Sequence, residues 1–150
     1  MIELIKIFHF EMAHAIYGYP GACKNIHGHS YELHVAVSPV KNHVDYLPGP
    51  GFVIDFKEIK KLVNTFIVER LDHKIVLSNR FLVENPSFFS PENLVTWQVE
   101  PTAENILLYI VKELCPHLPE TILLSCLKLF ETKDSYAQWT NSNVFTARSQ

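Results

Sequence analysis

Apolar and polar side chains alternate over residues 29–38, and this pattern narrows the possible folds more than any other part of the sequence. Successive side chains of a β-strand point to opposite faces, so the alternation predicts one long strand. A strand with one apolar face and one less apolar face is typical of an antiparallel sheet that is covered on one side. The first face carries His29, Tyr31, Leu33, Val35 and Val37, and the second carries Ser30, Glu32, His34, Ala36 and Ser38.

The remaining periodicities predict three more strands and two helices. The strands are expected over residues 2–10, 121–131 and 135–145, one helix after an N-cap at Asp55, and a second helix between Thr102 and Pro116. Residues 74–99, which include Pro86 and Pro91, are expected to be loop with short elements. The order strand, strand, helix, helix, strand, strand predicts an α+β fold, an antiparallel sheet with both helices on one face.

The strand predicted over residues 121–131 is apolar on both faces, unlike the others. Its apolar side chains are Ile122, Leu123, Leu124, Leu127, Leu129 and Phe130. Such a strand is covered on both sides, either by the chain's own core or by a second subunit.

Length and composition predict one globular domain over residues 1–150. With 150 residues, 47% of them hydrophobic, the chain is long enough to bury a core. A net charge of -3 without a basic block argues against a nucleic-acid partner, and no apolar run has the length of a membrane span. The first residues lack the pattern of a signal peptide. Three widely spaced cysteines, Cys23, Cys115 and Cys126, favour a reducing, cytoplasmic setting over a disulfide framework.

Three histidines near the N-terminus have the spacing of a metal site. His27 and His29 lie two residues apart where the alternating strand begins, so their side chains share a face, and His14 precedes them. Neutral imidazoles bind zinc, and three nitrogens leave one coordination position open, which distinguishes catalytic zinc from structural zinc. The alternative is that all three are polar loop residues satisfied by local hydrogen bonds.

Cys23 lies shortly before His27, in a loop that contains glycine and proline. Near a metal ion its thiolate would be favoured by the positive charge, so it is a candidate base, nucleophile or fourth ligand. The alternative is a small, buried apolar residue.

Charged residues later in the chain add further candidates. Asp72 can orient the imidazole of His73 and stabilise its protonated form, although a cation at a helix C-terminus is also favourable for stability alone. Glu104 lies in the first turn of the second helix, where the helix dipole is a sufficient explanation. Glu131 ends a largely buried strand, so its carboxylate either meets paired N–H donors, as on a cyclic amidine, or reaches water.

Six short segments carry a resemblance to a known family. They are Phe10–His14, Cys23–Tyr31, Gly51–Phe56, Leu71–His73, Pro101–Asn105 and Glu131–Thr132. In these residues, and in their order along nearly the whole chain, the sequence resembles the 6-pyruvoyl-tetrahydropterin synthase / 6-carboxytetrahydropterin synthase family. The resemblance implies a tunnelling fold, a four-stranded antiparallel sheet with two helices on one face. It also implies that three chains form a barrel and that two barrels stack as a homohexamer.

The resemblance implies a role for each candidate residue. Zinc would be bound by His14, His27 and His29, and Cys23 would accept a proton from the substrate. Asp72 with His73 would relay protons, Glu131 would anchor the pterin ring and be linked with the relay, and Thr102 and Glu104 would line the pterin pocket.

The reaction implied by the family begins with 7,8-dihydroneopterin triphosphate and expels triphosphate. One branch makes 6-pyruvoyl-tetrahydropterin. The other also releases acetaldehyde and makes 6-carboxytetrahydropterin, on the route to deazapurine tRNA bases such as queuosine. Three residues separate Cys23 from His27, which looks like the bacterial carboxy branch, whereas the animal pyruvoyl branch has a longer gap.

Two other hypotheses and one departure from the family pattern remain. The chain is alternatively a non-catalytic zinc-binding module with Cys23 as the fourth ligand, or a related pterin aldolase or epimerase. Residues 74–100 form a longer stretch than in the compact bacterial members, which leaves the details of substrate recognition open.

Overall fold

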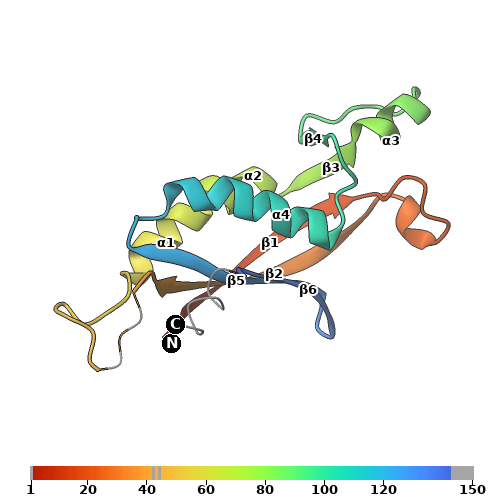
Figure 1. Ribbon diagram of the computed structural model, residues 1–150. Coiled ribbons are helices and arrows are strands. Elements are labelled where there is room, and N and C mark those ends of the chain that lie inside the picture. Colours follow the sequence, from red (N-terminus) through yellow and green to blue (C-terminus); the bar gives the residue numbers. More distant parts are fainter. Residues whose placement is uncertain (1, 42, 44, 143–150) are drawn as a thin grey trace.

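A six-stranded sheet forms one layer of the molecule, and helices cover one of its faces (Figure 1). The computed structural model describes residues 2–41, 43 and 45–142. In space the strands follow the order β4-β3-β1-β2-β5-β6. Their bounds are β1 Leu4–His14, β2 His27–Pro39, β3 Lys74–Ser78, β4 Leu94–Trp97, β5 Ile122–Thr132 and β6 Ser135–Thr140.

The expectation of a four-stranded antiparallel sheet is wrong in number and partly wrong in direction. The predicted strands are present as β1, β2, β5 and β6, which pair antiparallel with one another. The segment expected to be mostly loop adds β3 and β4, and β3 pairs parallel with Met12–His14 of β1. These two strands have five and four residues, too few for an alternation to stand out. The part of the last predicted strand beyond residue 142 lies outside the described residues.

The two predicted helices pack side by side on one face of the sheet (Figure 1). The first comprises α1 (Phe56–Val63), a π-helical segment (Asn64–Val68) and α2 (Glu69–Leu71), and the second is α4 (Ala103–Leu114). Asp55 is the N-cap that was expected, because its side chain accepts from the Lys57 N–H at 2.8 Å. The second helix begins after Thr102, as expected, and Thr102 caps it by accepting from the Asn105 N–H at 3.3 Å. Short helices α3 (Asn79–Glu84), η1 (Ala22–Lys24) and η3 (Cys115–His117) complete the fold. No helix among the described residues is long and apolar enough to cross a membrane.

The π-helical segment lets the first helix keep one face on the core. Ile59, Val63, Ile67 and Leu71 recur at intervals of four residues and are all at most 1% exposed. Four residues of α-helix rotate by about 400°, so this spacing would drift by about 40° at each step. A π turn is wider, with i→i+5 hydrogen bonds, and it corrects part of that drift.

The core lies between the helices and one face of β1, β2 and β5, while the other face of the sheet is open. On the helix side, Phe10, Tyr31, Leu33 and Leu127 are at most 2% exposed. The covered face continues to the end of β1 and β2 near η1, where β3, α3 and β4 also lie (Figure 1). That end of the covered face holds the predicted histidines.

Candidate metal centre and active site

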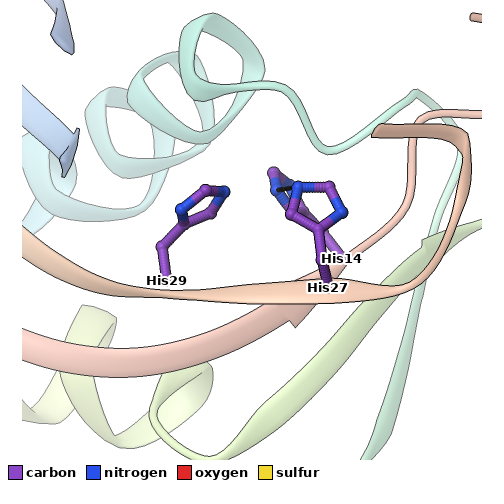
Figure 2. Close-up of side chains that lie close together, drawn as sticks. All are labelled: His14, His27 and His29. Carbon is purple, nitrogen blue, oxygen red and sulfur yellow. Dashed lines mark hydrogen bonds between the residues drawn. The ribbon is translucent and has the colours of Figure 1, made fainter. Parts of the chain in front are cut away.

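The three predicted histidines meet on the covered face, at the end of the central strand pair. His14 of β1 is the direct cross-strand partner of His27 of β2, and His29 is two residues further along β2. Residues two apart on a strand share a face, so all three rings converge (Figure 2). Both strands are longer than predicted at this end, which places His14 and His27 inside the sheet rather than in a loop.

The spacing of the three rings fits one bound metal ion. One ligand atom from each of His14, His27 and His29 lies within 4.8 Å of the other two. The Nε2 atoms of His14 and His27 are 3.1 Å apart. Two nitrogens that bind one tetrahedral zinc at about 2.0–2.1 Å are about 3.3 Å from each other, close to this separation.

Backbone carbonyls determine which ring nitrogens face the centre. His14 Nδ1 lies 2.6 Å from the Pro101 carbonyl and His27 Nδ1 lies 2.8 Å from the Asn25 carbonyl. A carbonyl oxygen only accepts, so each Nδ1 carries the proton, and in a neutral ring Nε2 is then a bare lone pair. Two lone pairs 3.1 Å apart repel unless a cation binds both. Carbonyl partners on the far nitrogen are the usual support of metal-binding histidines.

Burial also favours the neutral form of His14, a residue that is 2% exposed. Removal from water is the largest cause that lowers the pKa of His14, and the neighbouring His27 and His29 lower it further; the Pro101 carbonyl and the Glu131 carboxylate act in the opposite direction but do not reverse the shift. The neutral imidazole favoured in this way is the form that binds a metal ion.

Tyr31 is a site residue that sequence reasoning assigned only to the apolar face of its strand. Its side chain is fully buried, and its hydroxyl lies 3.4 Å from Glu131 Oε1 and 3.5 Å from His14 Nε2. Burial and the nearby Glu131 carboxylate raise the pKa of Tyr31. Its place two residues after His29, on the same face, is the sequence signal that could have identified it.

Glu131 stands at the edge of the three histidines. Its Oε1 lies 4.0 Å from Nε2 of His14 and 4.0 Å from Nε2 of His29. The carboxylate is therefore within reach of the centre, but in this arrangement it does not belong to the group of three ligand atoms.

A pocket of about 400 Å³ opens over the three histidines. It is lined by Cys23, Thr102, Glu104 and Glu131, four of the residues predicted for catalysis and substrate binding. Cys23 is exposed, which excludes the alternative of a buried apolar residue. The group of close ligand atoms does not include Cys23, so this geometry does not favour a closed four-ligand site.

Asp72 and His73 contact each other but lie away from this pocket. His73 Nδ1 is 3.0 Å from Asp72 Oδ1, and the same oxygen accepts the Glu11 N–H at 2.8 Å. The Glu11 N–H and the adjacent imidazole hold the pKa of Asp72 below its usual range. His73 lines a second pocket with Glu11 and Ser30, whose side chains point to the open face of the sheet. The two pockets share only His29.

Comparison with known proteins gives the family. The family model described as 6-pyruvoyl tetrahydropterin synthase matches residues 3–142. The 6-carboxy-5,6,7,8-tetrahydropterin synthase of Rickettsia felis is 31% identical over 142 residues, which are 92% of this chain and 99% of that protein. The enzyme of the same name from Haemophilus influenzae is 32% identical over 145 residues, 93% of this chain and 99% of the relative.

Two further matches extend the comparison. The dihydroneopterin monophosphate aldolase of Pyrococcus furiosus is 30% identical over 123 residues, 81% of this chain and 82% of that protein. The solved structure of Caenorhabditis elegans 6-pyruvoyl tetrahydropterin synthase superposes with a TM-score of 0.68 at 20% identity, covering 94% of this chain and 96% of that one. The match to the family model over nearly the whole chain, together with these relatives, shows that the chain is a lyase-type enzyme of the 6-pyruvoyl tetrahydropterin synthase family.

Proposed function

We propose that this chain is a zinc-dependent lyase that converts 7,8-dihydroneopterin triphosphate to 6-carboxytetrahydropterin, releasing acetaldehyde and triphosphate. The observation that carries the proposal is the distance of 3.1 Å between the Nε2 atoms of His14 and His27, with a ring nitrogen of His29 within 4.8 Å of the ligand atoms of both. A bound zinc would act there as a Lewis acid toward the side-chain oxygens of the substrate, which makes the neighbouring C–H bond more acidic.

The protein side chains of the pocket supply the remaining chemistry. Cys23 is exposed beside the three histidines and accepts the proton from the activated C–H bond. Glu131 faces the paired N–H donors of the pterin ring, and the Tyr31 hydroxyl holds its carboxylate in place. Thr102 and Glu104 line the side of the pocket formed by the start of α4.

The position of Asp72 and His73 supports a site shared between chains. His73, which contacts Asp72, lines a pocket with Glu11 and Ser30 toward the open face, whereas Cys23 lines the pocket at the covered face. A relay from Asp72 and His73 to Cys23 therefore requires His73 of a neighbouring copy. The open face also exposes Ile5 and Ile7 by 52% and 47%, as expected of a surface that another subunit covers. We propose a homohexamer of chains that each form one domain over residues 1–150, working in the cytoplasm on a route to queuosine.

The choice of product rests on two observations. Three residues separate Cys23 from His27, as in the bacterial carboxy branch that the chain resembles. The Rickettsia felis and Haemophilus influenzae relatives are named as synthases of the 6-carboxy product. The alternative product, 6-pyruvoyl-tetrahydropterin, needs elimination of triphosphate without loss of acetaldehyde.

Incubation with dihydroneopterin triphosphate, followed by mass analysis of the pterin product, tests the proposal. The zinc-loaded protein is expected to yield 6-carboxytetrahydropterin, and a chelator is expected to stop the reaction until zinc is restored. A 6-pyruvoyl product would move the chain to the other branch. Turnover of dihydroneopterin monophosphate instead would favour the aldolase activity named for the Pyrococcus furiosus relative.

A further inference from the structure

Glu100 makes an unusual set of contacts just before α4. Its carboxylate Oε1 accepts from the Ser78 hydroxyl at 2.7 Å, and Oε2 accepts from the Tyr17 N–H at 2.8 Å. Its backbone carbonyl accepts from the Asn105 side chain at 2.8 Å. Ser78 is 1% exposed, so one end of this network is inside the protein. Within the described residues, no cationic side chain lies within ion-pair distance of this carboxylate.

One arm of the network reaches the loop that carries Cys23. The Ile16 N–H donates to the Cys23 carbonyl at 2.8 Å, which closes the loop between β1 and η1. Tyr17 follows Ile16 directly, and its N–H is the one that Glu100 Oε2 holds. The carboxylate therefore anchors the base of the loop that brings the thiol to the pocket.

The other arm reaches the metal centre. Pro101 is buried directly after Glu100, and its carbonyl accepts from His14 Nδ1 at 2.6 Å. The Glu100 carbonyl also accepts the Thr102 N–H at 2.9 Å, so the turn that presents the Pro101 carbonyl is held at both ends. That carbonyl determines which nitrogen of His14 faces the centre.

We propose that Glu100 is a positioning residue for the metal centre, acting through Pro101 on His14 and through Tyr17 on the Cys23 loop. One carboxylate sets the position of the 94–102 segment relative to the end of β1, and both a metal ligand and the thiol depend on that position. Glu100 does not line the pocket over the histidines. Its loss is therefore expected to lower zinc affinity and kcat, with little effect on KM.

This inference rests on the proposed zinc site, and zinc affinity measured by competition with a chelator tests it. Glu100→Ala removes both side-chain contacts and is expected to weaken zinc binding about tenfold. This is the lower end of the loss of metal affinity that follows when a residue supporting a metal-binding histidine is removed. Glu100→Asp is too short to reach both donors and should behave in the same way, which covers the case in which the alanine variant does not fold. Glu100→Gln is expected to bind zinc nearly as the wild type does. Its amide oxygen can accept from Tyr17, and its NH₂ can donate to Ser78.

Glu113→Ala is the matched control, because it removes a glutamate whose 2.6 Å ion pair with Arg70 lies away from the site. It should leave zinc affinity unchanged. The inference would be overturned if Glu100→Asp bound zinc as tightly as the wild type. It would also be overturned if Glu100→Ala folded, lost only heat stability and kept the wild-type zinc affinity. Equal losses in Glu100→Ala and Glu100→Gln would also overturn it, because charge rather than positioning would then be responsible. A wild-type chain that binds no zinc would instead refute the proposed function on which the inference depends.

Discussion

At the scale of single residues, the sequence predicted which side chains assemble but not how they are held. His14, His27 and His29 were predicted from residue type and spacing, whereas the roles of Cys23 and Glu131 were implied by the resemblance to the family. All five border one pocket. The carbonyl of Pro101, the hydroxyl of Tyr31 and the carboxylate of Glu100 were not predicted. Their roles depend on contacts between segments far apart in the chain, and no local pattern encodes such contacts.

Tyr31→Phe tests the hydroxyl that lies between His14 and Glu131. The phenyl ring keeps the stacking on Phe10, whose ring centroid is 5.1 Å away, and only the hydroxyl is lost. Glu131 is then free to turn, so KM for the pterin substrate is expected to rise several-fold. The upper limit is roughly tenfold, which corresponds to the loss of about 1.4 kcal/mol, the value of one hydrogen bond. Steady-state kinetics at saturating zinc measure the change. An unchanged KM would show that Tyr31 does not hold Glu131.

Asp72→Asn tests the lowered pKa of this carboxyl group. A carboxyl group with a lowered folded-state pKa stabilises the protein fully above its unfolded pKa of about 3.9, and this contribution is lost as the pH falls through the lower folded value. Asp72→Asn is therefore expected to be less stable than the wild type at pH 7, and the difference should shrink below about pH 4. Urea unfolding of both proteins at pH 7 and below about pH 4 measures the difference in their free energies of unfolding. A difference that does not depend on pH would contradict the assigned cause.

At the scale of elements, long periodic segments were predicted well and short ones were not. The 29–38 alternation and both helix starts, capped by Asp55 and Thr102, agree with the structure. The strands β3 and β4 were not identified as strands. β3 pairs with Met12–His14, which is distant in the sequence, and β4 pairs with β3, which is nearly as short as β4 itself. The helix was predicted without its π segment, because the apolar stripe Ile59, Leu62, Val63, Phe66 and Ile67 recurs at steps of three and four residues and fits an ordinary α-helix.

Ile67→Ala tests the packing of the π-helical segment. Ile67 is fully buried, so its truncation is expected to destabilise the fold by about 2–5 kcal/mol. Thr65→Ala, at an exposed position of the same segment, should change stability by no more than about 0.5 kcal/mol. Urea unfolding of both variants measures these values. Similar stabilities for the two would mean that this segment does not pack as described.

At the scale of the whole molecule, the candidate residues fall into two groups. The cysteine and the three histidines lie at the covered face, and Asp72 with His73 lies toward the open one. The sequence predicted both groups but not the face on which each lies, because only contacts with β1, such as the hydrogen bond from the Glu11 N–H to Asp72, place the turn that carries Asp72 and His73. The open face and the doubly apolar β5 fit burial against a second copy.

Mixing two inactive variants tests whether neighbouring chains share a site. Cys23→Ala and His73→Ala proteins are each expected to be inactive. After co-expression or joint refolding, about a quarter of randomly assembled shared sites would combine an intact Cys23 with an intact His73. Activity should return to about that fraction of the wild-type value. If no activity returns although mixed oligomers form, each site draws both residues from one chain.

Zinc content per chain tests whether His14, His27 and His29 bind one metal ion. The wild-type protein, reconstituted with zinc and freed of excess metal, is expected to hold one zinc per chain. His14→Ala, His27→Ala and His29→Ala should each lose the metal, because the three ring nitrogens form the candidate ligand group. His117→Ala is the control, since His117 stacks on Phe66 away from the centre, and it should retain the metal. A wild-type chain without zinc, or full zinc content in the three histidine variants, would refute the proposed zinc site.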